Sequence, residues 1–496
     1  MSLSNIAFIK RLKNTFLENF KAQGTAHFSE VVPNPLKNPI LVSTNTLLAE
    51  ELGLKHTNIT EPAMLNIMAG DFSETSLKPI ALVYSGHQFG VWAGQLGDGR
   101  AMTLGELPVE KSDNGTPQLW DIQLKGAGAT AYSRFADGRA VLRSSIREYL
   151  CSEAMHGLGI ATTRALCLVT SETPVYREEV EAAAILCRVA RSHIRFGSFE
   201  HFHYRNQPDA IKAMADYLIE RHFPSWVDTD QRYIKLFIHT VEETAKTIAQ
   251  WQSVGFAHGV MNTDNMSILG DTIDYGPFGF LDAYNPSFIC NHSDTNGRYS
   301  FKNQPSIGLW NLNALATAMM TLIPSDTLID VLKTYEPTFL KHYNQLMLTK
   351  LGLIHCKDDD QILTQDLLTL LEDSKVDYTL FFRQLCYFSA SNTSIRDMFL
   401  HRELFDDWAE LYIQRLNQQP STEQERLVAM KQANPKYILR NYMAQTAISK
   451  AEVGDYSEID LMLKILQNPF EEHPEAEHYA GLPPDWAETI SVSCSS

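Results

Sequence analysis

The residues best suited to chemistry lie between positions 258 and 274 of this chain. His258 is followed seven residues later by Asn265, and Asp274 comes nine residues after that. Asp264 stands directly before the asparagine. Amide and carboxylate oxygens suit Mg²⁺, which takes its remaining ligands from phosphates and water. The stretch predicts a metal-assisted site for nucleotide chemistry, and the alternative is a surface hairpin with solvated acids.

The local pattern around this site predicts a β-hairpin. Two short β-prone runs flank Gly270 and Asp271, a Gly-X pair suited to a two-residue turn. In that register Ser267 lies opposite Asp274, so Asn265 comes down close to Asp274. The hairpin would therefore bring the two metal ligands together.

The spacing also matches the catalytic loop H-R-D-L-x-x-x-N and the metal-binding D-F-G of protein kinases, with one change. Aligning His258 and Asn265 on that template puts Val260 where the catalytic aspartate should be. Asp264 offers a carboxylate nearby instead. The pattern indicates nucleotide chemistry on a kinase-like scaffold with a displaced base, and it leaves open whether the reaction is ordinary phosphoryl transfer or another transfer from a nucleotide.

A glycine-dense stretch upstream could hold the phosphates of a nucleotide. Residues 84–105 contain six glycines, and the core of the stretch, 94–100, reads GQLGDGR. Glycines let backbone amides approach phosphate oxygens closely, and Arg100 adds positive charge. The spacing differs from the kinase G-x-G-x-x-G, and a pair of ordinary hairpin turns is the alternative.

A strand lysine and a helix glutamate follow. Residues 118–125 alternate like a half-buried strand and end on Lys125. Ser145 and Glu148 resemble a capping box that opens a helix, which ends near Gly157 and Gly159. One interpretation is a kinase-like pair in which Glu148 holds Lys125 for phosphate binding. The other is a helix-capping acid and a surface lysine.

The distribution of charge favours the phosphate-binding interpretation. The net charge of −17 argues against a general nucleic-acid binder, whose footprint is a basic face. Cationic residues nevertheless gather in two short stretches, and they are Lys125, Arg134, Arg139, Arg143 and Arg147, then Arg188, Arg191 and Arg195. Arginines beside apolar runs in an acidic protein indicate a phosphate pocket. Ion pairing to the abundant acids is the alternative for some of them.

Several long motifs resemble the selenoprotein O family of protein adenylyltransferases. These motifs are 84–90 (YSGHQFG), 126–128 (GAG), 137–145 (DGRAVLRSS), 258–279 and the C-terminal 494–496 (CSS). The likeness covers nearly the whole chain. It implies a kinase-fold pseudokinase that moves AMP from ATP onto Ser, Thr or Tyr hydroxyls of proteins. The family binds ATP in a flipped orientation that presents the α-phosphate for attack.

The resemblance also implies roles for individual residues. Those assigned to the nucleotide are Gly97, Gly99, Arg100, Lys125, Asp137, Gly138, Arg188, Arg195 and Asp274. Lys125 would pair with Glu148, and the two arginines would hold the buried terminal phosphates. Asn265 and Asp274 would bind Mg²⁺ or Mn²⁺, and Asp264 would accept the hydroxyl proton. Cys494 occupies the place that some members fill with selenocysteine.

Three functions are compatible with these residues. AMP transfer from ATP is the first, and the family resemblance carries that choice. The same site could transfer UMP from UTP, with Mn²⁺ favoured, or the γ-phosphoryl group, because all of these reactions need metal, cations and a base. A non-catalytic pseudokinase scaffold is the third, motivated by Val260. The joint retention of Lys125, Glu148, Asn265 and Asp274 argues against it.

The cysteines indicate an intracellular chain with buried thiols, since there is no C-x-x-C and no zinc spacing. The ones expected in the core are Cys151, Cys167, Cys187, Cys356 and Cys386. Cys494 lies in a polar chain end, and Cys290 follows Asp274 by sixteen residues, where a kinase activation segment would run. We hypothesise a redox-sensitive disulfide between Cys290 and Cys494 that ties the tail over the site. Two unrelated thiols are the alternative.

The fold class predicted is α+β, a protein-kinase-like bilobal fold. We expect an N-terminal extension (1–78), a strand-rich N-lobe (79–205), a helical C-lobe (206–420) and a C-terminal extension with the redox tail (421–496). The apolar periodicity predicts helices at Ala210–Arg221, Phe237–Val254, Leu309–Leu322, Thr327–Gln345 and Leu363–Leu371.

The remaining expectations concern the surface and the setting of the protein. The amphipathic stretch Ile6–Phe20 is expected to be a structural helix, with a transit peptide as the alternative. No apolar run reaches membrane-spanning length. A cytoplasmic monomer is therefore expected, with no membrane or nucleic-acid partner. The acids at 358–360 are expected in a solvated loop or helix start, and His473 and His478 at the surface.

Overall fold

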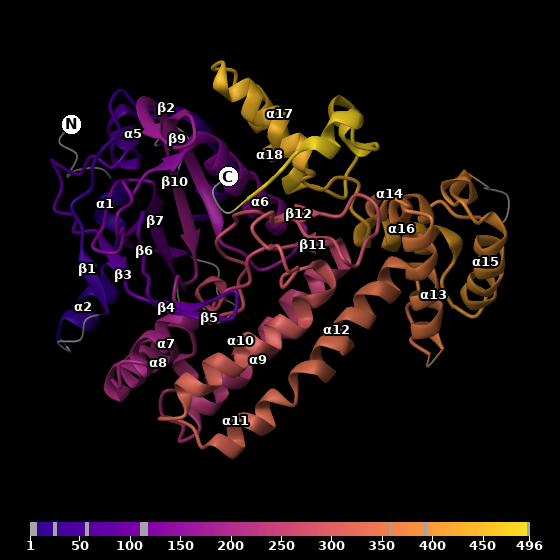
Figure 1. Cartoon of the computed structure of the whole chain (residues 1–496), viewed down its shortest axis with the longest axis horizontal. Helices are drawn as coiled ribbons and strands as arrows, with labels where there is room; N and C mark the ends of the chain where they lie inside the picture. The colour runs from indigo at the N-terminus through magenta and orange to yellow at the C-terminus, as the bar shows by residue number, and fades with distance from the viewer. Residues whose placement is uncertain are drawn as a thin grey trace.

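The protein has a strand-rich N-terminal part and a helical C-terminal part, as the computed structural model in Figure 1 shows. The structure describes residues 7–22, 27–54, 59–109, 118–357, 359–389 and 394–493. This arrangement confirms the predicted α+β class with a kinase-like order of lobes. The division of the chain at residues 78, 205 and 420 stays a prediction.

One antiparallel sheet forms the centre of the N-terminal part. In spatial order its strands are β1 (Phe28–Glu30), β3 (Ile80–Leu82), β6 (Ala101–Val109), β7 (Gln118–Lys125), β10 (Val180–Ala190), β9 (Arg164–Tyr176) and β2 (Ile40–Thr44). The short β8 (Ala140–Val141) lies beside β10. A separate hairpin of β4 (Ser85–Gln88) and β5 (Val91–Gln95) comes between β3 and β6 in the chain.

The two faces of this sheet belong to different hydrophobic cores. Along β10, Ala184 and Leu186 pack into the core shared with the helical part, whereas Ile185 and Cys187 pack into a second core. Successive side chains of a strand point to opposite faces, so Arg188 shares the face of Leu186. The helices over the second core precede residue 78, and they are α1 (Ala7–Arg11), α3 (Thr46–Glu51) and α5 (Pro62–Met68).

Helix α6 (Leu142–Gly157) packs against the inner face of the sheet, the face that carries Ala184 and Leu186. The helix ends as predicted, with Gly159 in the left-handed region at φ 75°. Its start differs from the prediction. The chain enters α6 directly from β8, and the N-cap residue Val141 makes no side-chain cap. Ser145 and Glu148 are buried within the helix. The predicted capping box is therefore wrong, because tertiary contacts engage Glu148 instead.

The C-terminal part is built from helices. They are α7 (Phe196–His203), α8 (Pro208–His222), α9 (Arg232–Val254), α10 (Gln304–Met319), α11 (Ser325–Leu332), α12 (Tyr335–Lys350), α13 (Asp360–Asp373), α14 (Tyr378–Leu385), α15 (Arg402–Leu416), α16 (Glu423–Ala433), α17 (Asn441–Glu452) and α18 (Ser457–Gln467). Most of the helices predicted from periodicity are confirmed. Helix α9 ends at Val254, the next residue Gly255 caps it in the left-handed region at φ 73°, and the chain then enters the catalytic loop.

Two predicted helices are each split in the structure. The stretch expected as one helix from residue 6 to 20 forms α1 and α2 (Thr15–Ala22), and Lys13 between them exchanges backbone hydrogen bonds with Glu106 of β6. The stretch from Thr327 to Gln345 forms α11 and α12. Pro337 lies in the first turn of α12 and has no amide hydrogen to continue a preceding helix.

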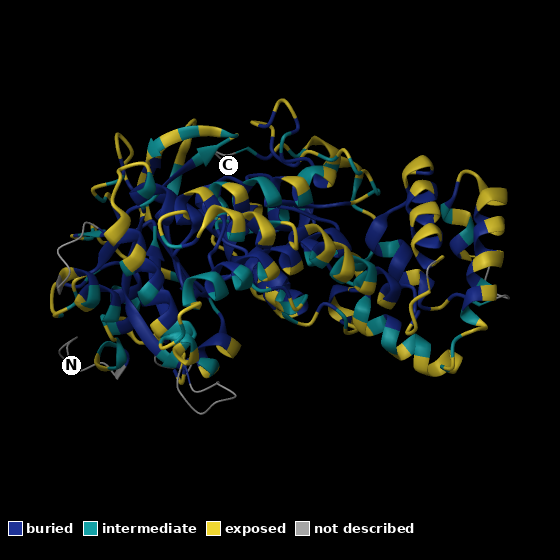
Figure 2. Ribbon diagram, turned by 90° about the horizontal axis from the view of Figure 1, so that it is seen from below, coloured by how far each residue is buried: buried dark blue, intermediate teal, exposed yellow. Residues whose placement is uncertain are grey.

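Buried residues run through the whole molecule, and exposed residues lie on the outer helix faces (Figure 2). A third hydrophobic core packs helices α13, α14, α15 and α16 together at the end of the molecule away from the sheet. Helix α18 returns to pack its apolar side against α6. Within the described part of the chain, no helix is both long and apolar enough to cross a membrane.

Candidate active site

A cavity of about 690 Å³ lies between the sheet and the catalytic loop. Most of the residues predicted for the site line it, and they are Gly97, Gly99, Arg100, Lys125, Asp137, Gly138, Arg188, Asp264, Asn265 and Asp274. Glu148 and Arg195 lie behind its wall, where they bind lining residues. The structure thus brings together segments from six different elements and loops.

Lys125, at the end of β7, forms a buried ion pair with Glu148 of α6. Its Nζ lies 2.5 Å from Glu148 Oε2, while the other carboxylate oxygen accepts a hydrogen bond of 3.1 Å from Arg188 Nη1. Burial lowers the pKa of Lys125, and the charge of Glu148 opposes this shift. Of the two interpretations of these residues, the lysine–glutamate pair is the one present.

Asp274 lies among three largely buried cations, Lys125, Arg188 and Arg195, which together form a cationic wall. Its Oδ1 lies 2.5 Å from Arg188 Nη1, and its Oδ2 lies 2.5 Å from Arg195 Nη1. Burial would raise the pKa of Asp274, but Arg195, Arg188 and Lys125 hold it well below its usual range. The backbone of Asp274 has φ 58°, a left-handed conformation that is uncommon outside glycine and that clusters at functional sites.

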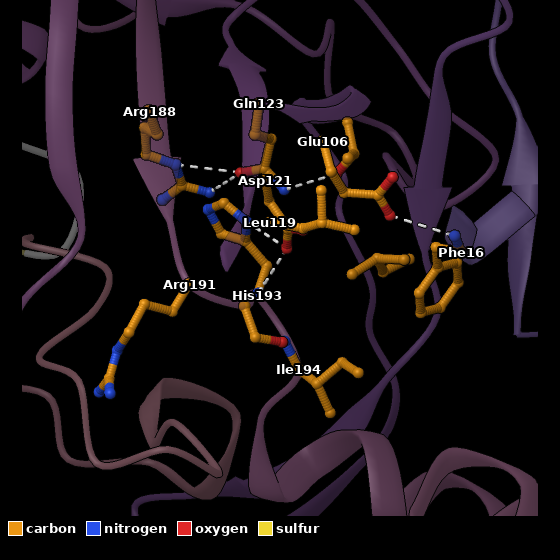
Figure 3. Close-up of polar contacts among 12 residues, drawn as sticks. Phe16, Glu106, Leu119, Asp121, Gln123, Arg188, Arg191, His193 and Ile194 are labelled. Carbon is orange, nitrogen blue, oxygen red and sulfur yellow. Dashed lines mark hydrogen bonds and ion pairs between the residues drawn. The ribbon is translucent and has the colours of Figure 1, made fainter. Parts of the chain in front are cut away.

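Gln123 positions Arg188, and sequence reasoning missed it. Gln123 Oε1 accepts a hydrogen bond of 3.0 Å from Arg188 Nε and a second bond from Nη2 (Figure 3). Gln123 precedes Lys125 by two residues on β7, so strand alternation puts both side chains on one face. This alternation is the sequence pattern that could have placed Gln123 beside Lys125 at the site. Asp121, two residues earlier, binds the backbone and ring of His193 in the same view.

Arg195 is held from several sides just behind the cavity. Besides Asp274, it donates a hydrogen bond of 2.7 Å to the backbone oxygen of Asp264. Its guanidinium lies 4.4 Å from the ring centroid of Tyr84, which lines the cavity. Arg195 therefore fixes the backbone of the catalytic loop as well as the metal-loop aspartate.

Asp264 lies in a 3-10 turn, Thr263–Asn265, and is only 6% exposed. Gln88 Nε2 donates a hydrogen bond of 3.2 Å to Asp264 Oδ2, whereas Oδ1 is buried and has no hydrogen-bond partner among the described residues. Burial raises the pKa of Asp264 to about 6. A carboxylate with an unused oxygen at the edge of a cavity can accept a proton. Gln88 was not predicted, although it lies in the motif 84–90.

The oxygen atoms around Asn265 fit a divalent metal. Asn265 Nδ2 donates a hydrogen bond of 3.0 Å to Val260 O, which fixes the amide so that its oxygen is the remaining ligand atom. Asp274 offers carboxylate oxygens, each with a second lone pair. No group of three or more His, Cys, Asp or Glu in the described residues could hold a metal alone. Nucleotide-bound Mg²⁺ usually takes only one or two protein groups.

The hairpin predicted around these ligands has another register. Met266 pairs with Thr272, and the amide of Gly270 donates to Ser267 O, so residues 267–271 form a longer loop. Ser267 instead pairs with Arg195. The predicted pairing of Ser267 with Asp274 is therefore wrong, because pairing with Arg195, the N-cap residue of α7, overrides the local turn signal. Asn265 and Asp274 still line one cavity.

The glycine-rich loop lies close to Tyr132. Gly97 has φ 122°, and a Cβ atom there would come within 2.5 Å of the Tyr132 ring. A Cβ on Gly99 would lie 3.0 Å from Tyr132 O. These glycines are therefore needed for close approach inside the protein as well as for space beside a ligand. Arg100 is exposed at the mouth of the cavity.

Asp137 is held by an arginine that the sequence did not indicate. Arg177, in the β9–β10 turn, lies with its two Nη atoms 2.9 Å from the two Asp137 oxygens. Hydrogen bonds from Arg177 are the main cause that lowers the pKa of Asp137. Gly138 has φ 69° and packs directly on Gly128, so any side chain there would clash.

The arginines of the predicted phosphate pocket fall into two groups. Arg188 lines the cavity, as do Arg134 and Arg139. Others are committed to acids or backbone elsewhere: Arg143 binds Glu181, Arg191 binds Asp271, and Arg147 donates to Phe278 O. Ion pairing, the alternative considered from the sequence, therefore holds for Arg143 and Arg191.

The cysteines mostly follow the predictions. Those confirmed as buried are Cys151, Cys167, Cys187 and Cys386, but Cys356 is exposed after α12, so its core assignment is wrong. Cys290 is buried behind the catalytic loop, where its Sγ would lie 2.7 Å from a Cβ on Gly259. Cys494 lies outside the described residues, and its pairing with Cys290 stays a prediction.

Two surface predictions need correction. His473 is buried, and its ring lies 3.0 Å from Asn468 O, whereas His478 is exposed as expected. Asp360 begins α13 as one expectation had it, but it is buried in an ion pair with Arg415. Local polarity misled both interpretations, because the partners come from distant segments.

Comparison with known proteins agrees with this geometry. The family model described as protein adenylyltransferase SelO matches residues 10–467. The chain belongs to the SelO family. It is 49% identical over 490 residues to the protein nucleotidyltransferase YdiU of Myxococcus xanthus, covering 98% of this chain and 99% of that protein. It is 50% identical to the YdiU protein of Pectobacterium atrosepticum, over 97% of this chain and 99% of that protein. It is also 50% identical to the YdiU protein of Vibrio cholerae, over 96% of this chain and 98% of that protein.

Membership of the SelO family makes this chain an enzyme, a protein nucleotidyltransferase. The alternative of a non-catalytic scaffold is thereby overturned. A nucleotide and an acceptor protein are its substrates, and a divalent metal is implied by this chemistry. The donor atoms of Asn265 and Asp274 fit such a metal.

Proposed function

We propose that the protein transfers AMP from ATP to Ser, Thr or Tyr hydroxyls of other proteins. The observation that carries this proposal is the enclosed cationic wall formed by Lys125, Arg188 and Arg195 around Asp274. Terminal phosphates bound there would be shut away from an incoming protein. The α-phosphate would then be the one left for attack, which agrees with the family description as an adenylyltransferase.

The proposed roles of the remaining residues follow from their places around the cavity. Gly97, Gly99, Asp137 and Gly138 would line the nucleotide, with Arg100 at the mouth. Asn265 and Asp274 would hold Mg²⁺ or Mn²⁺, which when bound neutralises phosphate charge. The buried cations are already oriented by Glu148 and Gln123, so they need no reorganisation as charge develops.

Asp264 would serve as the general base of the reaction. It would accept the hydroxyl proton as the acceptor oxygen forms its bond to the α-phosphorus. The bond between that phosphorus and the bridging oxygen to the β-phosphate then breaks, and pyrophosphate leaves. Support for this role comes from the Oδ1 atom, which is buried and has no hydrogen-bond partner in the part of the chain that the structure describes, and from the neighbouring Asn265.

Mass spectrometry of an acceptor protein tests the proposal. The purified chain is incubated with casein, equal concentrations of ATP and UTP, and Mg²⁺ or Mn²⁺ under reducing conditions. Peptides that carry AMP on Ser, Thr or Tyr are expected. Peptides that carry UMP would support uridylyl transfer from UTP, and peptides that carry only phosphate would support a kinase.

We also propose that Cys290 and Cys494 form a redox-sensitive disulfide that regulates this site. Two contacts support it: Cys290 packs behind the catalytic loop, and the amide of His292 donates a hydrogen bond of 3.0 Å to Val492 O. The tail therefore reaches the segment that carries Cys290. Non-reducing peptide mapping after oxidation should recover the linked pair, and recovery of both peptides as separate thiols would contradict it.

A further inference from the structure

The segment that follows Asp274 and its loop, residues 282–303, contacts the catalytic loop at several points, and one of these contacts is the hydroxyl group of Tyr299. Tyr299 is buried, and its hydroxyl donates a hydrogen bond of 2.6 Å to Asn262 Oδ1. The same hydroxyl accepts a bond of 2.9 Å from the amide of Phe89 in the β4–β5 turn. The Phe89 amide also lies 3.1 Å from Asn262 Oδ1. Tyr299 therefore joins three segments that are far apart in the sequence.

The residue held by this hydroxyl is itself strained. Phe89 has φ 51°, a left-handed conformation that is unfavourable for a bulky residue with a side chain. Such a conformation persists only where neighbouring contacts determine it. Here those contacts are the two hydrogen bonds that the Phe89 amide donates and the packing of the Phe89 and Tyr299 rings, whose centroids are 5.1 Å apart.

The position of the β4–β5 hairpin in turn sets the surroundings of Asp264. Gln88 donates to Asp264 Oδ2, and the amide of His87 donates a bond of 2.7 Å to Thr263 Oγ1. A Cβ on Gly86 would lie 2.8 Å from Asp264 Oδ1. The hairpin is thus in direct contact with the carboxylate, and a small shift of Phe89 would move the groups that surround it.

Asp294 fixes Tyr299 from within the same segment. It is buried, its Oδ2 accepts a bond of 2.7 Å from the Tyr299 amide, and its Oδ1 accepts a bond of 2.9 Å from the Arg298 amide. The same segment binds the C-terminal tail through His292 and Val492. A path therefore runs from the tail to His292, along the chain to Asp294, and from Asp294 through Tyr299 to the catalytic loop.

We propose that Tyr299 is a positioning residue, through which the order of segment 282–303 sets the rate of nucleotidyl transfer. Tyr299 is absent from the cavity lining, so it acts through Asn262 and Phe89. Asp294 acts in turn through Tyr299. This inference rests on the proposed function only for its kinetic readout, because the structural link can be measured without turnover.

The test compares Tyr299→Phe with Tyr412→Phe in the full chain. Tyr412 is an equally buried tyrosine in α15 whose hydroxyl donates to Leu351 O, remote from the cavity. Hydrogen exchange is measured for peptides covering 85–95 and 259–266. Tyr299→Phe should speed exchange in both peptides, whereas Tyr412→Phe should leave both unchanged. Equal exchange in the two variants would overturn the inference, whether or not AMP is the transferred group.

Kinetics with α-labelled ATP supply the second readout. Tyr299→Phe should lower kcat about tenfold or more, because small misplacements of catalytic groups are costly, and should leave the ATP dissociation constant within about twofold. A change in ATP affinity with unchanged kcat would contradict a positioning role. If the wild type transfers no α-label, the proposed function fails and the exchange result alone decides the inference.

Asp294 tests the direction of the path. Asp294→Ala should reproduce the faster exchange at 85–95, and Asp294→Asn, which keeps one acceptor oxygen, should restore part of the protection. Combined with Tyr299→Phe, Asp294→Ala should add nothing further to the loss of kcat. Additive losses in the double variant would show that Asp294 acts independently of Tyr299 and would overturn the path.

Discussion

Glu148→Gln is the substitution that tests the cationic wall most sharply. The carboxylate of Glu148 lies between Lys125 Nζ at 2.5 Å and Arg188 Nη1 at 3.1 Å. The glutamine keeps the shape of the side chain but removes the negative charge. Arg188 retains Asp274 as a partner, whereas Glu148 is the one hydrogen-bond acceptor of Lys125 in the described residues. Lys125 is therefore the cation left without a hydrogen-bonded carboxylate, with Asp274 as a more distant negative charge.

The size of the effect follows from this burial. Removing one partner of a buried ion pair costs about 3–5 kcal/mol, and the retained amide oxygen places the loss near the lower figure. Burial already lowers the pKa of Lys125 against the charge of Glu148, so the loss of that charge lowers it further. A mispositioned or neutral lysine no longer stabilises phosphate charge, which should lower kcat about 10²–10³-fold.

Glu153→Gln is the matched control on the same helix. Glu153 is buried in α6 and binds Arg164 through both oxygens at 2.8 and 2.9 Å, away from the cavity lining. Denaturant unfolding should show comparable losses of stability for both variants. When the two variants are compared at the same concentration of folded protein, the rate of α-label transfer should fall strongly only in Glu148→Gln. Equal loss of activity in the two variants would refute the role given to the Lys125–Glu148 pair.

Three further substitutions give distinct outcomes. Asp264→Asn should lower kcat about 10²–10⁴-fold with ATP binding kept, measured by label transfer and calorimetry, and unchanged kcat would remove Asp264 as the base. Asp274→Asn should abolish the additional thermal stabilisation that Mg²⁺ gives to the ATP complex, and a retained metal effect would place the metal elsewhere. Burial lowers the pKa of Lys350 to about 7, so the unfolded chain binds more protons from pH 7 to about 10 and stability rises across that range. Lys350→Met should remove this rise and stabilise the protein by about 1–4 kcal/mol at pH 7, and an unchanged pH profile of unfolding would contradict it.

Much of the site could be predicted because its residue types occur in long local motifs. Asn265, Asp274 and Asp264 are recognisable by spacing, and all three line the cavity. Strand alternation in β7 and β10 places Lys125 and Arg188 on the inner face of the sheet. The broad order of strands followed by helices is likewise encoded in local periodicity, which is why the fold class was predictable.

The parts that escaped prediction depend on contacts between distant segments. Phe89 and Tyr299 are 210 residues apart, and Arg177 and Asp137 are 40 apart. No local pattern reports such pairs. For Glu148 the residues alone left a helix cap and a pair with Lys125 as alternatives, and only its contact with Lys125 of β7 decides between them. The hairpin register failed for the same reason.

The most direct measurement of the central claim uses ATP labelled separately at the α- or γ-phosphate. Wild type and Asp274→Ala are incubated under reducing conditions with Mg²⁺ or Mn²⁺ and casein, and label on protein is counted. Transfer of AMP at this cavity predicts α-label on protein with the wild type, no γ-label, and neither with Asp274→Ala. Label from the γ-phosphate, or α-label that persists in Asp274→Ala, would contradict it.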